Sequence, residues 1–137
     1  MVRVVFADTF YWLAMARPRD LWHAATLSWS AQNKTTRIVT TTEVLTEYLN
    51  GLAKGGPGAR AHAVNTVRAI RNDAQVDVLP QTEADFHAAL ALYEARPDKE
   101  YSLVDCRSMI ALRALGIADV LTNDHHFTQE GFTIVFP

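Results

Sequence analysis

The segment RIVTTTEVLTEYLNGL, residues 37–52, decides the fold class of this chain, because a strand pattern in it passes directly into a helix pattern. Residues 37–41 are mostly β-branched, which favours a buried strand. From Val44 to Leu52 the apolar residues recur every three or four positions, as they do along one face of a helix. The segment KGGPG, residues 54–58, then ends the helix, since glycine and proline break this periodicity.

The same alternation of strand and helix patterns continues on both sides of this segment. We expect further strands at residues 3–7, 76–79, 120–122 and 133–136, and further helices at residues 20–32, 59–72, 82–96 and 102–115. We interpret these runs, rich in apolar and β-branched residues, as buried strands without regular apolar and polar alternation, which is typical of a sheet buried on both faces. The sequence therefore predicts an α/β protein with a parallel or largely parallel central sheet between two layers of helices, a three-layer α/β/α arrangement.

Two of these helices carry apolar residues that we expect to face the core. In the helix at residues 20–32 the apolar positions repeat every four residues, and they are Leu21, Ala25 and Trp29. In the helix at residues 82–96 the expected core positions are Phe86, Ala89, Leu90 and Tyr93.

Length and composition indicate one ordinary globular domain covering residues 1–137. Hydrophobic residues make up 49% of the chain and charged residues 20%, which favours neither disorder nor a membrane class. Thirteen Lys and Arg and fifteen Asp and Glu give a net charge of −2, so any site for a polyanion must be a local one. The single cysteine, Cys106, excludes an intrachain disulfide and fits a reducing cytoplasm. No export signal or membrane anchor is expected, since the apolar stretch at residues 4–16 is too short to span a bilayer.

Four acidic residues, far apart in the chain, are expected to meet at one edge of the sheet. In a parallel sheet with right-handed connections, the carboxyl ends of the strands and the first turns of the following helices share an edge. Asp8 directly follows the first strand, and Glu47 lies about one turn into the helix after the second. Asp105 lies in the first turn of the helix at residues 102–115, and Asp124 follows the next strand. Carboxylate oxygens without a neighbouring basic cluster are ligands of hard divalent cations, so we expect a Mg²⁺ or Mn²⁺ site.

Three of these acids also have a purely structural explanation. Asp8 and Asp124 occupy positions where Asp commonly ends a strand or begins a turn. Asp105 fits a capping box with Ser102, in which the acid at the third helical position pairs with the N-cap residue. The convergence of the four positions, rather than any one of them, indicates a functional site.

Three further polar residues near these acids, one glutamate and two histidines, are assigned structural roles. Glu43 has the capping-box spacing from Thr40, whereas Glu47 lies past the first turn, where capping explains little. Glu47 is therefore the functional candidate of the two. His125 and His126 are adjacent, so both cannot easily face one ion, and a loop or packing role is expected for them.

Four short motifs in this chain, taken in order, resemble those of a known family. They are VFADT at residues 5–9, VTTTEVLTE at 39–47, SLVDC at 102–106 and LTNDHHF at 121–127, with Gly131 and Phe132 after the last. This ordered set resembles the PIN-domain ribonucleases, in particular the VapC-like toxins of bacterial and archaeal toxin–antitoxin pairs. The resemblance extends over essentially the whole chain and implies a three-layer PIN-like fold.

The resemblance also implies which residues form the active site. By position, the acidic quartet of the family falls on Asp8, Glu47, Asp105 and Asp124, which would hold Mg²⁺ or Mn²⁺, with the hydroxyls of Thr9 and Ser102 as supports. Many members of the family carry Thr or Ser just before the third acid and a further Asp two residues after the fourth. This chain has Val104 and His126 at those places, which leaves open whether a second metal ion binds.

A function and partners follow from the same resemblance. The expected protein is a metal-dependent endoribonuclease that hydrolyses phosphodiester bonds of structured RNA, tRNA or rRNA, and is the toxin of a toxin–antitoxin pair. A cognate antitoxin protein, a homodimer and a cytoplasmic location are implied as well. The alternative is a noncatalytic PIN-like module that binds RNA or protein, in which the four acids are structural. The chemistry favours an enzyme with a metal ion, since four carboxylates alone would repel a phosphate.

RNA binding requires a local basic surface on a chain whose net charge is −2. The candidates are Arg17, Arg19, Lys54, Arg60, Arg68 and Arg71. Three of them alternate with apolar residues in the helix at residues 59–72, so a solvated helix face explains them equally well.

Overall fold

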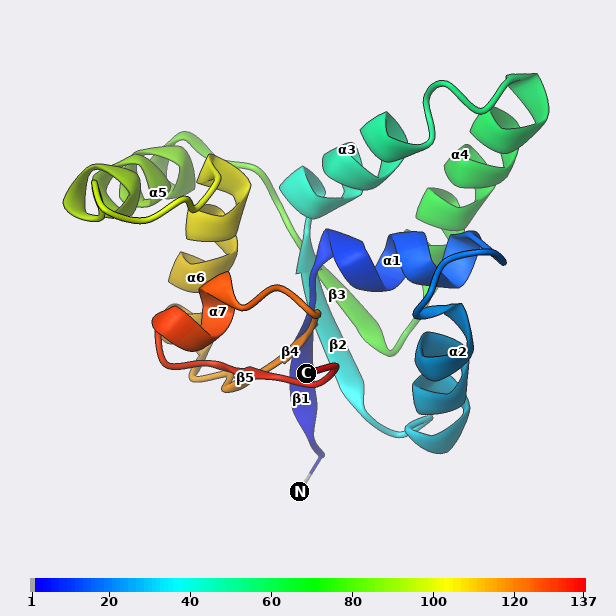
Figure 1. Cartoon of the computed structure of the whole chain (residues 1–137), viewed down its shortest axis with the longest axis horizontal. Coiled ribbons are helices and arrows are strands. Elements are labelled where there is room, and N and C mark those ends of the chain that lie inside the picture. Colours follow the sequence, from blue (N-terminus) through cyan, green and yellow to red (C-terminus); the bar gives the residue numbers. More distant parts are fainter. Residues whose placement is uncertain (1) are drawn as a thin grey trace.

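The computed structural model describes residues 2–137 and has a five-stranded parallel sheet at its centre (Figure 1). The strands are β1 (Val4–Ala7), β2 (Arg37–Thr41), β3 (Val76–Leu79), β4 (Asp119–Leu121) and β5 (Thr133–Ile134). Their order across the sheet is β3-β2-β1-β4-β5, and each neighbouring pair is parallel. The register places Phe6 of β1 between Val39 of β2 and Val120 of β4. The predicted α/β class with a parallel sheet is confirmed.

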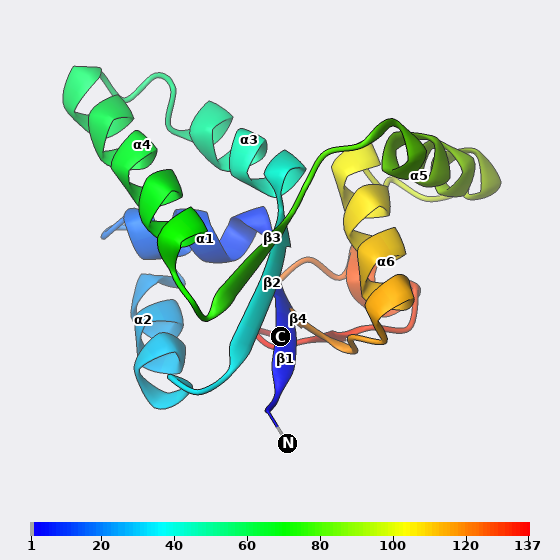
Figure 2. The ribbon, with the colours of Figure 1, turned by 180° about the vertical axis from the view of Figure 1, so that it is seen from behind.

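Two layers of helices cover the sheet. Helices α1 (Thr9–Ala16), α2 (His23–Gln32), α3 (Thr42–Gly51) and α4 (Pro57–Asn72) lie on one side. Helices α5 (Glu83–Ala95), α6 (Leu103–Leu115) and α7 (His126–Gln129) lie on the other side, as the two opposite views show (Figures 1 and 2). This is the expected three-layer α/β/α arrangement. Among residues 2–137, no helix is both long and apolar enough to cross a membrane.

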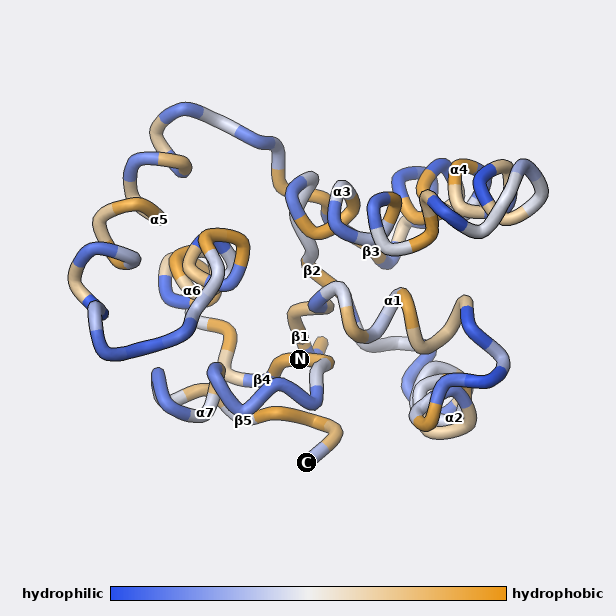
Figure 3. Tube along the Cα trace, turned by 45° about the horizontal axis from the view of Figure 1, so that its top comes forward, coloured by the Kyte–Doolittle hydropathy of each residue, from blue (hydrophilic) through white to orange (hydrophobic). Residues whose placement is uncertain are grey.

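The core lies on both sides of the adjacent strands β1 and β4. Phe6 of β1 and Leu121 of β4 are fully buried. On one side of the sheet they are covered by helices that include the buried Tyr11 and Tyr48, and on the other side by α6 with the buried Met109. Figure 3 shows the same distribution along the chain: β1 and much of α6 are hydrophobic, whereas the α1–α2 and α5–α6 connections are hydrophilic.

The described part of the chain contains two helices that the sequence does not predict, α1 and the short α7, and the helix expected at residues 20–32 is shorter. Helix α2 begins at His23 rather than at Asp20. The carboxylate of Asp20 accepts a hydrogen bond from the backbone N–H of Trp22 (2.8 Å), and such a local turn competes with a helix. Leu21 therefore lies outside the helix and is 89% exposed, so its assignment to the core is wrong.

Helix α5 packs on α6 with a different face from the one expected. Ala89, which was correctly assigned to the core, is buried together with Leu92. Phe86, Leu90 and Tyr93 are instead about half exposed, at 44%, 44% and 52%, so their assignment to the core is wrong. Apolar residues occur on more than one side of this helix, and the side that is buried carries Ala89 and Leu92. Spacing alone therefore does not single out the buried face.

Candidate metal centre

The carboxyl ends of β1 and β4 and the first turns of α1, α3 and α6 meet at one edge of the sheet (Figure 1). Asp8 lies between β1 and α1, with only 7% of its surface exposed. The hydroxyl of Thr122, which follows β4, donates a hydrogen bond to Asp8 Oδ2 (3.0 Å). This contact joins the two adjacent strands at the point where each one ends.

Glu47 approaches the same place from α3. It lies in the second turn of that helix and is half-buried. The hydroxyl of Thr9, the first residue of α1, donates a hydrogen bond to Glu47 Oε1 (2.6 Å). Thr9 therefore fixes one carboxylate oxygen of Glu47 in the neighbourhood of Asp8, whose pKa is affected by the charge of Glu47.

Asp105 and Ser102 form the capping box that their spacing indicates. Ser102 is the N-cap of α6, and its Oγ accepts a hydrogen bond from the backbone N–H of Asp105 (3.0 Å). The backbone N–H of Ser102 donates in return to Asp105 Oδ2 (3.0 Å). The structural explanation of Asp105 is therefore correct, but the one capping hydrogen bond leaves a lone pair of Oδ2 and the whole of Oδ1 for a ligand. Capping and metal binding by Asp105 are compatible.

Asp124 follows β4, and His126 lies two residues later, at the start of the short helix α7, which the sequence does not predict. The backbone N–H of His126 donates to Asp124 Oδ1 (2.9 Å). His126 Nδ1 lies 3.4 Å from Asp124 Oδ1 and 3.5 Å from Asp105 Oδ2. The expected loop role fits His125, which is exposed, whereas His126 turns its ring toward the acids. The two histidines differ in their separation from Asp124 along the sequence, and this is the signal that distinguishes them. An Asp side chain commonly accepts a hydrogen bond from the backbone N–H two residues later, which is the position of His126.

The acids are close enough to disfavour one another's ionisation. Burial, and after it the negative charge of Asp105 and that of Glu47, raise the pKa of Asp8 to about 7, although two hydrogen bonds oppose this shift. Burial and the charge of Asp124 raise the pKa of Asp105, opposed by its capping N–H and by His126. Among residues 2–137, His126 is the only basic side chain within ion-pair distance of these four acids. A bound cation would remove the repulsion, so the charge balance favours one.

The residues present fit a divalent cation. Asp105, Asp124 and His126 each offer one ligand atom, and these three atoms lie within 4.8 Å of one another. Nδ1 of His126 is buried and has no hydrogen-bond partner in the described part of the chain, so it is available as a ligand. Asp8 borders this group, since the charge of Asp105 raises the pKa of Asp8, and Glu47 lies close to Asp8, because its charge raises the same pKa. The structure thus brings all four acids to one place, together with a histidine that the sequence reasoning assigned to packing.

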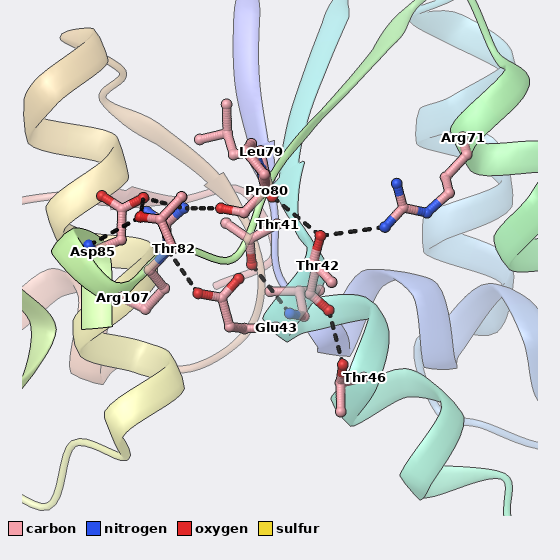
Figure 4. Close-up of polar contacts among 11 residues, drawn as sticks. Thr41, Thr42, Glu43, Thr46, Arg71, Leu79, Pro80, Thr82, Asp85 and Arg107 are labelled. Atoms are coloured by element: carbon pink, nitrogen blue, oxygen red, sulfur yellow. Dashed lines mark hydrogen bonds and ion pairs between the residues drawn. The ribbon is translucent and has the colours of Figure 1, made fainter.

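Glu43 is not the capping residue that its spacing from Thr40 suggests. Thr40 and Thr41 both belong to β2, so α3 begins one residue later than a cap at Thr40 requires. The N-cap is Thr41, whose hydroxyl accepts a hydrogen bond from the backbone N–H of Val44 (3.1 Å). Glu43 Oε2 instead accepts from Arg107 Nε (2.8 Å), which joins α3 to α6 (Figure 4). The capping prediction for Glu43 is wrong, and its role is a buried ion pair.

The six basic candidates for RNA binding are all exposed. Three of them donate to nearby acceptors: Arg17 to Gly51 O (2.8 Å), Arg60 to Ala53 O (3.0 Å) and Arg71 to Thr42 Oγ1 (3.2 Å). The last contact places the guanidinium of Arg71 at the first residue of α3, at the sheet edge where the acids lie (Figure 4). Lys54 lies instead in the turn at the outer end of the α3–α4 pair (Figure 1).

Comparisons with known proteins agree with this fold. The chain is similar in structure to VapC20 from Mycobacterium tuberculosis, described as a sarcin-ricin loop cleaving toxin, with 29% sequence identity and a TM-score of 0.85 over 97% of this chain and 99% of that one. It shares its fold with VapBC2 from Rickettsia felis, solved bound to a DNA fragment from its promoter (12% identity, TM-score 0.66, 96% of each chain). It also shares its fold with FitAcB from Neisseria gonorrhoeae (14% identity, TM-score 0.66, 95% of each chain).

No curated protein sequence gives a significant match to the chain. A family model, that of the PIN domain, matches residues 5–132. This range contains β2, β3 and β4, all of β1 except Val4, and all four acids of the candidate metal centre, and β5 follows directly after it. The chain therefore belongs to the PIN domain family.

Proposed function

We propose that this protein is a metal-dependent endoribonuclease, the toxin of a toxin–antitoxin pair, which hydrolyses phosphodiester bonds in structured RNA. The observation that carries the proposal is the meeting of the acids at one sheet edge: Asp8, Glu47, Asp105 and Asp124. In the described chain these acids have no Lys or Arg in ion-pair contact, so they suit a divalent cation. Without a cation, the same carboxylates would repel a phosphate.

The acids have distinct roles in this reaction. Asp8, Asp105 and Asp124 hold Mg²⁺ or Mn²⁺, directly or through water. When bound, the ion polarises the scissile phosphoryl oxygen and lowers the pKa of a bound water. Glu47 is a further ligand or orients the attacking water, and the hydrogen bond from the first turn of α1 holds its carboxylate in place. The capping box keeps Asp105 at the start of α6.

Water is the nucleophile in this proposal, so neither a serine nor a cysteine is required. The only cysteine, Cys106, is buried, and burial raises the pKa of its thiol. A raised pKa disfavours the thiolate that a nucleophilic cysteine needs. Cys106 therefore packs as a small hydrophobic residue beside Asp105.

The likeness to VapC20 supports a folded RNA as the substrate. That protein, 29% identical over nearly its whole length, is described as a toxin that cleaves the sarcin-ricin loop. We extend the class of substrate, structured tRNA or rRNA, to this chain. A cognate antitoxin, a homodimer and a cytoplasmic location are proposed from membership of the family.

A local basic surface would hold the RNA, since the net charge of −2 opposes binding elsewhere. Arg71 is supported by its contact with Thr42 at the edge that carries the acids. Arg68 lies on the same helix, α4, and is exposed. We propose that these two arginines contact phosphates of the substrate.

The test compares RNA from bacteria that express the wild-type chain, Asp105→Asn or Asp98→Asn. Asparagine at position 105 keeps an oxygen that can accept the capping hydrogen bond but loses the negative charge. Asp98 is the matched control, because it is an aspartate outside the site whose side chain is 73% exposed. We expect growth arrest and new RNA 5′ ends with the wild type and Asp98→Asn, but not with Asp105→Asn. New ends with all three chains, or with none, would contradict the proposal. RNA binding without cleavage by the wild type would indicate the noncatalytic module instead.

A further inference from the structure

His126 lies in the metal centre without a role in the reaction described above. Its Nδ1 faces Asp105 Oδ2 at 3.5 Å and Asp124 Oδ1 at 3.4 Å. We propose that His126 is a ligand of the divalent ion through Nδ1, and that this nitrogen makes the site prefer first-row transition ions, such as Mn²⁺ and Co²⁺, over Mg²⁺. The inference rests on the proposed function, because it concerns the same ion.

The spacing of the three atoms is that of ligands around one ion. In a site with metal–ligand bonds of about 2.1 Å, neighbouring ligand atoms lie about 3.0 Å apart at right angles and about 3.4 Å apart at the tetrahedral angle. The distances from His126 Nδ1, 3.4 and 3.5 Å, lie at the upper end of this range and just beyond it. All three ligand atoms lie within 4.8 Å of one another, so a small inward movement brings them into contact with one cation.

The Nδ1 atom contacts no polar group of the described chain other than the two carboxylates that would share the ion. It is buried and has no hydrogen-bond partner among residues 2–137. An unprotonated imidazole nitrogen and two carboxylates present lone pairs to one another, which is repulsive unless a proton on the nitrogen or a metal cation lies between them. Burying such a nitrogen without a partner costs free energy, so a bound ion explains why it faces this way.

Neighbouring groups hold the imidazole in this orientation. The ring of Tyr101 packs against that of His126, with 5.4 Å between their centroids. The Tyr101 hydroxyl donates to Glu130 Oε1 (3.1 Å), and the carboxylate of Glu130 is itself paired with Arg96 (2.6 Å) and with Arg113. His126 is therefore oriented by a support that does not depend on the ion, as effective metal ligands are.

The type of ligand decides which ion is favoured. Mg²⁺ prefers oxygen ligands and keeps several waters, whereas imidazole is a good donor to transition ions, whose affinities rise from Mn²⁺ to Co²⁺. Loss of this nitrogen is expected to weaken Co²⁺ binding by about tenfold or more and to change Mg²⁺ binding by less than about threefold. The ratio of the two dissociation constants therefore reports on His126.

The test measures Co²⁺ and Mg²⁺ binding by titration calorimetry to the wild type, His126→Gln and His125→Gln. His125 is the matched control, because it is adjacent in sequence but exposed. We expect the preference for Co²⁺ to fall about tenfold in His126→Gln only. An unchanged preference in His126→Gln would overturn this inference and leave the nuclease proposal standing. Binding of neither ion to the wild type would refute both.

A spectroscopic measurement on the wild type keeps the inference testable if His126→Gln does not fold. Electron spin echo spectroscopy of bound Mn²⁺ detects the nucleus of a directly coordinated imidazole nitrogen. We expect this nitrogen modulation in the wild type and in His125→Gln. A wild-type Mn²⁺ complex without it has only oxygen ligands, which would overturn the inference.

Discussion

Glu43 and Glu47 lie four residues apart on α3, but their replacement by glutamine is expected to have opposite effects. Glu43→Gln removes one partner of a buried ion pair, in which the side chains of Arg107 and Glu43 are only 5% and 15% exposed. Breaking such a pair costs about 3–5 kcal/mol, because the remaining charge is left buried. Arg107 keeps two other contacts, with Asp85 Oδ2 (3.3 Å) and with Pro80 O (3.2 Å) (Figure 4). We therefore expect a loss of about 2–3 kcal/mol, or about 10 °C in melting temperature.

Glu47→Gln is expected to preserve the fold and remove the activity. The amide oxygen of glutamine can still accept the hydrogen bond from Thr9, and the loss of one charge relieves repulsion at Asp8 in the metal-free protein. The melting temperature without metal is expected to stay within about 2 °C of the wild type. RNA cleavage is expected to fall about 100-fold or more, as it does when a group at a metal site is removed.

Two assays separate these effects. Circular dichroism melting in EDTA measures the stability of both variants without metal, and cleavage of RNA in Mg²⁺ at a temperature well below every transition measures activity. Combining Glu43→Gln with Arg107→Gln completes a double-mutant cycle for the ion pair. A Glu43→Gln protein that melts within about 2 °C of the wild type would refute the buried ion pair. Full cleavage by Glu47→Gln would remove that residue from the metal centre.

Three further predictions concern acid stability, metal binding and RNA. The hydrogen bond from Arg96, together with those from Arg113 and Tyr101, lowers the pKa of Glu130 from 4.5 to about 2. The ionised carboxylate of Glu130 therefore stabilises the fold fully above pH 4.5, and this stabilisation is lost as the pH falls toward 2. Urea unfolding at several pH values in this window should show a steeper loss for the wild type than for Glu130→Gln, and parallel curves would refute this assignment. Millimolar Mn²⁺ should raise the melting temperature of the wild type more than that of Asp105→Asn, because the ion binds the folded state; equal shifts would count against the site. Reversing the charges of Arg68 and Arg71 together should weaken RNA binding and flatten its salt dependence in filter-binding assays, and an unaltered slope would clear both residues.

Local patterns and topology were sufficient to predict the sheet edge at which the acids meet. Asp8, Glu47 and Asp105 each lie within about two turns of a strand end or a helix start, so parallel connections bring them together whatever the remaining packing is. The capping box of Ser102 and Asp105 was predictable for the same reason, since all of its atoms lie within four residues. The three-layer architecture followed from the order of the elements.

Contacts with a partner outside the local pattern were not predictable. Arg107 lies 64 residues from Glu43, so the spacing around Glu43 suggested a cap where the structure has an ion pair. Leu21 fits a helical repeat, but the side chain of Asp20 forms a turn that excludes it from α2. His126 is directed to the site by a hydrogen bond from its backbone N–H to the side chain of Asp124, a local signal that the sequence prediction did not use. At Glu43 and Leu21 the deciding interaction competes with a local sequence pattern and prevails over it.

Diffraction from crystals grown with Mn²⁺ tests the metal centre most directly, because the anomalous signal locates the ion without reference to activity. We predict an anomalous peak at the carboxyl edge of the sheet, about 2.0–2.6 Å from a carboxylate oxygen of Asp105 and of Asp124 and bordered by Asp8 and Glu47. The absence of a peak at this edge at saturating Mn²⁺, or a peak only elsewhere on the molecule, would contradict the central claim that these acids hold a divalent ion.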